Sequence, residues 1–406
     1  MGPPRRRASR QLRPNCDRGV IHVGLDRLYV LLIAFLVVII SACATEPATD
    51  AEADVTAEPG TDADVSDDQT PDSTADDSTA DAEPTERTPV TVGGIGSLSD
   101  AGIYVAFEQG YFEEQGFDVT LETFTSALDI YPSLAAGQIQ VTRSAQGSQL
   151  FNAIAGDIPI RIVADGGNTC PGYGYLGITV RADLVESGEV SEPADLTGRS
   201  IAVAGQGGIS DIFLERVLEE GGLTFDDVDH LELGFPEQLA AFGNEALDAA
   251  VMIEPTMTAG IEQGLTELVW PGDEIYPCAQ TAMLVYSPEF AEDADAGNRF
   301  AIAYLQGVRD YNEAFSRETG GPDSPMFDEV VDILTTHTRV TDPEAYASIV
   351  PVGLHPDGDV NVDALKDDMS FYVDAGLVEE PPDLDEAVDM SFIEHAVEVL
   401  GPFQAD

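Results

Sequence analysis

Short apolar runs alternate with amphipathic segments along residues 89–406. The runs at 160–164 and 249–253 are rich in Ile, Val and Ala, as buried strands are, whereas neighbouring segments repeat apolar residues at helical spacing. Gly110 and Gly137 follow two such segments, at the position where a glycine commonly ends a helix. This alternation predicts an α/β fold with a mainly parallel sheet covered by helices.

The strand pattern occurs in two series, which predicts two lobes. Lobe one is expected over about 89–178 and 284–406, and lobe two over about 179–283. Apolar runs at 176–180 and 282–286 are predicted to be two crossover strands between the lobes, and the helical C-terminal part is expected to pack on lobe one. The remaining strands are predicted at 90–95, 117–123, 139–142, 160–164, 200–204, 229–233 and 249–253.

The N-terminus combines a positively charged stretch with an apolar run. Several Arg residues precede the run at 28–40, which ends at Ser41, Ala42 and Cys43. The run is shorter than the roughly 20 residues that span a bilayer and matches the core of a signal peptide. Its end resembles the lipobox of bacterial lipoproteins, in which the Cys is acylated and the chain is cut before it. We predict a lipoprotein signal peptide over 1–42 and a lipid on Cys43, with an uncleaved signal anchor as the alternative.

The segment after Cys43 is strongly acidic. Residues 44–88 are mostly Ala, Asp, Glu, Thr, Ser and Pro, so they have too little apolar surface to fold, and their charges extend the chain. Residues 43–88 are therefore predicted to be the lipid anchor and a disordered acidic tether. Residues 89–406 are predicted to form the folded body.

The overall charge limits the kinds of partner. The chain has 75 acidic and 18 basic residues, a formal net charge of -57. Such an acidic protein repels nucleic acid and anionic membranes at long range, so we expect no nucleic-acid partner. We expect a monomer.

Sequence signatures of common enzymes are missing. The chain has no G-x-S-x-G elbow, H-E-x-x-H motif, P-loop or Cys-x-x-Cys pair. Its four cysteines are too widely spaced for a zinc cluster. The glycine-rich loop at 205–208 follows a strand but lacks the third glycine of a dinucleotide fingerprint. We predict no catalytic residue, no cofactor and no metal.

Four loops that follow predicted strands and begin predicted helices are rich in hydroxyl and amide groups. In open α/β sheets, ligands bind outside the carboxyl ends of strands, where helix N-termini present free N–H groups. Plain helix capping is the alternative role for the Ser, Thr and Asp residues. The predicted ligand-binding residues are Ser97, Ser99, Asp100, Tyr104, Thr125, Ser126, Arg143, Ser144, Gln146, Gln206, Gly207, Gly208, Ser210 and Glu254.

Two charged residues leave the ligand class open. Arg143 could pair with a carboxylate or sulfonate, or form a structural ion pair with a nearby acid. Glu254 could bind a ligand donor, bridge the lobes or cap a helix. The ligand is therefore expected to be either a small anion or a neutral heteroaromatic compound such as a pyrimidine.

Cys170 and Cys278 each precede a predicted crossover strand. If the crossover strands lie side by side, the two sulfurs can meet, and export from the cytoplasm favours a disulfide. We predict this disulfide, with two buried thiols as the alternative.

Several segments resemble one family. Residues 105–117, VAFEQGYFEEQGF, are similar to the "VAxExGYFxxxGxxV" segment of substrate-binding proteins of the NMT1/THI5-like (nitrate/sulfonate/taurine, SsuA-type) family. Residues 134–139, LAAGQI, resemble its "LAAGxID" segment. The resemblance implies a type II periplasmic-binding-protein fold, with two α/β lobes joined by two crossover strands and with extra C-terminal helices. Further matching segments lie at 151–156, 160–163, 195–199 and 247–250.

The resemblance also implies a function. It predicts a non-enzymatic, extracytoplasmic lipoprotein, on the outer face of the cell membrane or in the periplasm, that captures a small molecule by hinged lobe closure. The partners would be an ABC permease and its ATPase. A ligand sensor is the alternative. A pyrimidine-forming enzyme of the wider family is disfavoured, because that branch relies on a Cys cluster that this chain lacks.

Overall fold

The computed structural model describes most of the predicted folded body. The predicted anchor Cys43, its signal peptide, the predicted tether up to residue 86, and the predicted ligand contacts Thr125 and Ser126 lie outside the described residues, whereas Thr88, predicted as the end of the tether, is in the first strand. No helix within the described part is long and apolar enough to cross a membrane. The described residues are 87–124, 129–156, 160–316 and 320–404.

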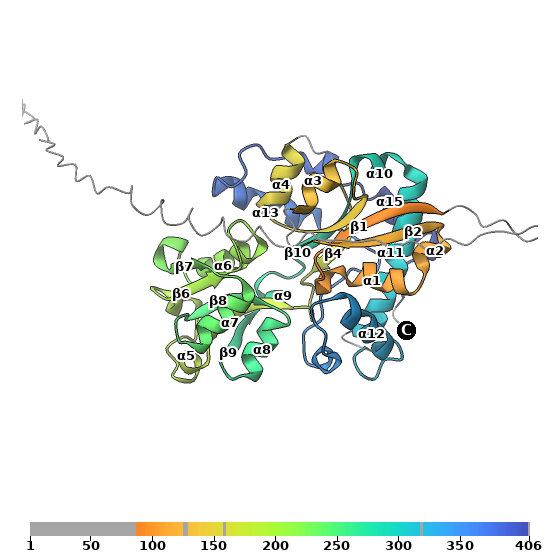
Figure 1. Ribbon diagram of the computed structural model, residues 1–406. Helices are drawn as coiled ribbons and strands as arrows, with labels where there is room; N and C mark the ends of the chain where they lie inside the picture. The colour runs from red at the N-terminus through yellow and green to blue at the C-terminus, as the bar shows by residue number, and fades with distance from the viewer. Residues whose placement is uncertain (1–86, 125–128, 157–159, 317–319, 405–406) are drawn as a thin grey trace, which may run out of the picture. The chain divides into compact units, whose positions relative to one another are not determined.

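The first sheet has five strands (Figure 1). Strand β1 (Thr88–Gly94) runs parallel to β2 (Phe117–Thr123) and β3 (Val141–Ala145), while β10 (Gln280–Tyr286) runs antiparallel to β3 and β4 (Arg161–Asn168). The order across the sheet is β2, β1, β3, β10 and β4.

Helices cover both faces of this sheet. Side chains alternate along β10, so Leu284 and Tyr286 enter one apolar core and Met283 and Val285 enter another. The first core contains α1 (Ala101–Glu108), α2 (Tyr111–Glu114), α10 (Pro288–Glu292), α11 (Ala294–Phe315), α12 (Phe327–His337) and α15 (Ser391–Leu400). The second contains α3 (Ile130–Ala135), α4 (Ser148–Ala155), α13 (Val362–Asp374) and α14 (Leu384–Ala387). Burial on both faces explains why β10 is continuously apolar from residue 282 to 286.

The second sheet also has five strands, and these form the green elements of Figure 1. Its order is β7 (Asp229–Glu232), β6 (Ser200–Val203), β8 (Ala249–Ile253), β5 (Leu176–Arg181) and β9 (Thr266–Pro271). Strand β6 is parallel to β7 and β8, and β5 is antiparallel to β8 and β9. The associated helices are α5 (Ala182–Glu186), α6 (Ile209–Glu220), α7 (Phe235–Gly243) and α8 (Thr256–Glu262).

The chain changes sheets just before the two strands that the sequence predicts as crossovers. Strand β5 lies within the second sheet and β10 within the first, so residues 169–175 and the segment with α9 (Gly272–Ile275) carry the chain across. The two crossing segments lie side by side, since Cys278 N donates to Thr169 O over 3.0 Å. A disulfide joins Cys170 to Cys278, 108 positions apart in the chain.

Single-turn elements complete the chain. In the described residues, 3-10 helices lie at η1 (Leu98–Asp100), η3 (Pro193–Leu196), η4 (Phe225–Asp227) and η5 (Pro343–Ala347). The α/β alternation predicted from the sequence is confirmed by the two sheets and their helices.

Candidate ligand-binding site

Loops from the carboxyl ends of both sheets meet at one place. Gly147, after β3, forms an antiparallel bridge with Gly208, after β6. The neighbouring Ser148 N donates to Gly207 O over 2.8 Å. Gly207 has a φ of +74°, which favours glycine, and a Cβ there would crowd the Ser148 side chain. Two of the loops predicted to bind ligand, one from each sheet, are therefore in contact.

Arg143 is the third of the five residues of β3, which runs beyond the predicted strand end at 142, and it is paired within the protein. Its Nε donates to Asp100 Oδ1 over 3.0 Å, and its Nη2 donates to Ser97 Oγ over 2.8 Å. Asp100 Oδ2 accepts from Ser97 N over 2.9 Å and from Tyr104 OH over 3.3 Å. The structure thus brings four predicted site residues into one buried network, and the ion-pair role considered for Arg143 is present.

The charges in this network stabilise one another. Burial alone would lower the pKa of Arg143, but the Asp100 carboxylate and its hydrogen bond raise it above its ordinary value. Burial raises the pKa of Tyr104, and the Asp100 charge raises it further. Tyr104 is therefore a neutral hydroxyl donor, and Arg143 is a cation beside a buried acidic side chain.

A second hydroxyl cluster lies beside Arg143. Tyr175, in the segment that crosses to the second sheet, donates from its OH to Thr281 Oγ1 over 2.7 Å. The predicted contact Ser99 is buried near Tyr175. Thr281 is not among the predicted site residues, because nothing in the sequence marks one Thr in an apolar strand.

Ser144 and Gln146 face helices of the second core. Ser144 Oγ lies 2.8 Å from Tyr131 OH in α3. Gln146 Nε2 donates to Asp368 Oδ2 over 3.2 Å, and Gln146 Oε1 accepts from Tyr372 OH over 3.0 Å. Both predicted residues are buried, and their hydrogen bonds join the end of β3 and the residue after it to helices α3 and α13.

The loop after β6 opens helix α6. Gly207 N donates to Asp211 Oδ2 over 2.6 Å, and Gly208 is the N-cap residue of α6. Gln206 is exposed and its carbonyl accepts from Gln149, while Ser210 is buried in the first turn of the helix.

Glu254 ends β8 and uses both carboxylate oxygens within the protein. Oε1 accepts from Thr258 Oγ1 over 2.8 Å and from Val350 N over 3.1 Å, and Oε2 accepts from Thr258 N over 3.1 Å. Burial raises the pKa of Glu254. Of the roles considered from the sequence, helix capping is observed, together with a tie to the segment at Val350 from the C-terminal part of the chain.

Two cavities lie in the described part of the chain near these elements. A small one of about 40 Å³ is lined by Gly94, Asp100, Tyr104, Thr123 and His337, beside the Arg143 network. A larger one of about 350 Å³ lies at the end of α11, lined by residues that include Asn168, Asn312 and Phe403, and none of the predicted ligand contacts line it. Among the described residues, no group of three or more His, Cys, Asp or Glu side chains is arranged to hold a metal.

The two lobes and their crossing segments define a periplasmic-binding-protein fold. The sulphonate-binding protein SsuA of Escherichia coli superposes with a TM-score of 0.59 at 16% identity, over 75% of this chain and 92% of that one. The desulfurization enzyme DSZB superposes with a TM-score of 0.53 at 16% identity, over 77% and 100%. At these identities, the similarity shows the shared fold.

The family follows from the sequence match. Residues 98–314 match the family described as NMT1/THI5 like, so the chain belongs to the NMT1/THI5-like family, as predicted. The formylaminopyrimidine-binding protein of Halalkalibacterium halodurans is 28% identical over 33% of this chain and 37% of its own length. The riboflavin-binding protein RibY of Chloroflexus aurantiacus is 24% identical over 70% and 74%. The chain thus spans just over a third of the first relative and about three quarters of the second.

Proposed function

We propose that this chain is the solute-binding component of an ABC importer and captures a small molecule between its two lobes. The observation that carries the proposal is the contact of strand-end loops from both sheets, Gly147 with Gly208 and Ser148 with Gly207. Ligands of open α/β sheets bind at this edge, so a solute bound there touches both lobes. Membership of the NMT1/THI5-like family and the names of its curated relatives support the same function.

The mechanism is closure of the lobes around the solute. Within the described residues, the segments at 169–175 and 272–279 carry the chain between the two sheets, and the Cys170–Cys278 disulfide fastens them together. Such a joint permits rotation of the lobes while it limits sliding, which suits hinge closure. A ligand favours closure only to the extent that it binds the closed form more tightly.

The place of action is outside the cytoplasm. We propose that Cys43 carries lipid, that residues 44–88 tether the folded body, and that a monomer delivers its solute to a permease and ATPase. The basis is the apolar run that ends at Ser41, Ala42 and Cys43, followed by the acidic segment. Mass spectrometry of the membrane fraction tests it: an acylated N-terminal Cys43 peptide supports the anchor, and an uncleaved N-terminus contradicts it.

For the ligand, we propose a nitrogen heterocycle. Both curated relatives are named for binding such compounds, formylaminopyrimidine and riboflavin. The hydroxyl groups of Ser97 and Ser99 and the guanidinium of Arg143 would supply hydrogen bonds that orient a polar ring. A small anion held by Arg143 is the second candidate.

A binding role is favoured over catalysis. The DSZB enzyme shares the fold, so the fold itself does not decide between the two. Within the described part of the chain, both cysteines are joined to each other and offer no thiol nucleophile. A sensor subunit would bind the same solute but signal through a different partner.

A thermal-shift screen tests the proposal. The purified chain is heated with pyrimidines, flavins, sulfonates, nitrate and carboxylates, and a bound solute raises the melting temperature because it stabilises the folded state. A concentration-dependent rise with unchanged solute after incubation supports a binding protein. No rise with any class, or turnover of the solute, contradicts it.

A further inference from the structure

Among the predicted ligand-binding residues, Arg143 carries a positive charge, and the others are neutral or acidic. Asp100 and Glu254 are the acidic members, and Asp100 is the one that contacts Arg143. The side chains of Arg143 and Asp100 are 7% and 1% exposed, so water screens their charges poorly. The charge of the guanidinium is therefore already compensated before any ligand arrives.

Asp100 is fixed in this position. Its Oδ2 accepts from the backbone N of Ser97 and from Tyr104 OH, at 2.9 and 3.3 Å, while Oδ1 accepts from Arg143. With Ser97 Oγ, which also donates to Oδ2 over 3.3 Å, four donors hold this carboxylate beside Arg143. Arg143 still has N–H groups to offer, because its Nη1 makes no hydrogen bond to the part of the chain that the structure describes.

We infer that Asp100 sets the charge selectivity of the site, so that it favours an uncharged polar solute over an anion of the same shape. An anion near Arg143 would also lie near Asp100, where low dielectric strengthens their repulsion, whereas a neutral acceptor gains the hydrogen bond without it. The inference rests on the proposed function and concerns which solute that site accepts.

The test pairs two probes with one substitution. Pyrimidine-5-carboxamide and pyrimidine-5-carboxylate have the same ring and differ by one charge, and their affinities are measured by calorimetry at fixed ionic strength. The wild-type chain is expected to prefer the carboxamide by at least about tenfold. Asp100→Asn keeps the side-chain size and removes the charge, so it is expected to raise affinity for the carboxylate by at least about tenfold.

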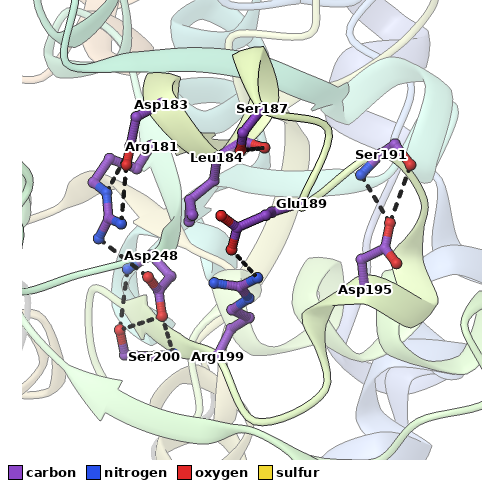
Figure 2. Close-up of polar contacts among 10 residues, drawn as sticks. All are labelled: Arg181, Asp183, Leu184, Ser187, Glu189, Ser191, Asp195, Arg199, Ser200 and Asp248. Atoms are coloured by element: carbon purple, nitrogen blue, oxygen red, sulfur yellow. Dashed lines mark hydrogen bonds and ion pairs between the residues drawn. The ribbon is translucent and has the colours of Figure 1, made fainter.

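A matched control lies at the opposite edge of the second sheet (Figure 2). Asp248 precedes β8 and pairs with Arg181 over 3.1 Å, and it also accepts from Ser200 at the start of β6. Asp248→Asn removes the same charge from an arginine pair at the amino ends of these strands. It is expected to leave both affinities within about twofold of the wild type, since these half-buried charges lie at the other end of the strands and solvent ions screen their effect on the site.

The outcomes separate the inference from the proposed function. A folded Asp100→Asn chain with no gain for the carboxylate, or an equal gain in Asp248→Asn, overturns the inference. If Asp100→Asn does not fold, the affinities of the wild-type chain decide. Tighter binding of the carboxamide than of the carboxylate supports the inference. Equal binding, tighter binding of the carboxylate, or no binding of either probe overturns it. The proposed function fails separately, when no solute of either charge binds in the broader thermal-shift screen.

Discussion

Nε of Arg143 lies 3.0 Å from Oδ1 of Asp100, and both side chains are more than nine-tenths buried. The two residues are 43 positions apart, with Asp100 in the turn η1 after β1 and Arg143 within β3, so the pair fastens that turn to β3. A buried ion pair contributes little net stability over an apolar replacement, but the loss of one partner leaves an uncompensated buried charge.

Removal of Arg143 alone is therefore expected to be costly. Arg143→Met should lower the free energy of unfolding by about 3–5 kcal/mol, because it leaves Asp100 buried without its cation. The double variant Asp100→Asn/Arg143→Met should recover part of this loss. Urea unfolding followed by circular dichroism measures both.

Arg199→Met is the control for that measurement. Arg199 pairs with Glu189 over 3.1 Å on the surface of lobe two, where Glu189 is 58% exposed (Figure 2). Exposed pairs contribute about 0–1 kcal/mol, so this variant should lose no more than that. Equal losses for Arg143→Met and Arg199→Met would contradict the buried-pair account.

The disulfide should stabilise the folded state through the loop that it closes. Cys170 and Cys278 enclose the whole of lobe two, with a sequence separation of 108. Closure of a loop of this length restricts the unfolded chain and contributes about 3–5 kcal/mol. The double variant Cys170→Ser/Cys278→Ser should therefore have a free energy of unfolding about 3–5 kcal/mol lower than the wild type, measured by urea unfolding. Alkylation of both residues in the unreduced native chain, detected by peptide mapping, would show instead that the bond does not form.

Acidification from neutral pH should stabilise the folded state through the buried carboxyl of Asp368. Asp368 of α13 is buried, and burial raises its pKa to about 7, with Arg216 and Tyr276 opposing the shift and Asp367 and Glu215 adding to it. The folded state thus holds a proton that the unfolded chain releases near its ordinary pKa. This stabilisation is complete below about pH 4 and is lost as the pH rises to about 7.

A variant isolates this contribution. Going from pH 7.5 to 5.5 should raise the free energy of unfolding of the wild type by about 1–2 kcal/mol more than that of Asp368→Asn. Asp374→Asn, an exposed carboxylate on the same helix, should behave as the wild type does. If Asp368→Asn kept the full pH response, the titrating group would lie elsewhere.

The strands buried on both faces were the predictable part of the fold. Strand β8 is Ala249–Ile253, as its apolar run predicts, and helix α6 likewise begins at Ile209 and ends at Glu220. Burial of whole runs leaves a strong local signal, because every side chain must be apolar or paired.

Strands with polar ends were predicted too short. The apolar pattern stops at 164, yet β4 continues to Asn168, because Asp165 accepts hydrogen bonds from His355 N and Gln280 Nε2 at 2.8 and 2.6 Å. Both partners lie more than a hundred residues away in the chain, so no local pattern reports them. Strand β9, TELVWP, was missed for a related reason: it is an edge strand with a half-buried, irregular pattern.

The candidate site was predictable as a set of loops but not as a set of contacts. Strand-end position placed Ser97, Asp100 and Arg143 together, and the structure brings them within hydrogen-bond distance. Which acid would pair with Arg143 depended on the turn at η1, whose geometry follows from packing against α1 and β4. The partner of Glu254, Val350, comes from a distant segment and has no sequence signal.

Solute-dependent closure of the two lobes is the most direct test of the central claim. Dyes are attached through non-natural amino acids at Asp118 in β2 and Glu262 in α8, two exposed positions on different lobes, so the disulfide stays intact. Energy transfer is recorded while the solute with the largest thermal shift is titrated. The account predicts a saturable change in transfer whose midpoint equals the calorimetric dissociation constant. Saturating solute that binds by calorimetry but leaves transfer unchanged would contradict capture by lobe closure.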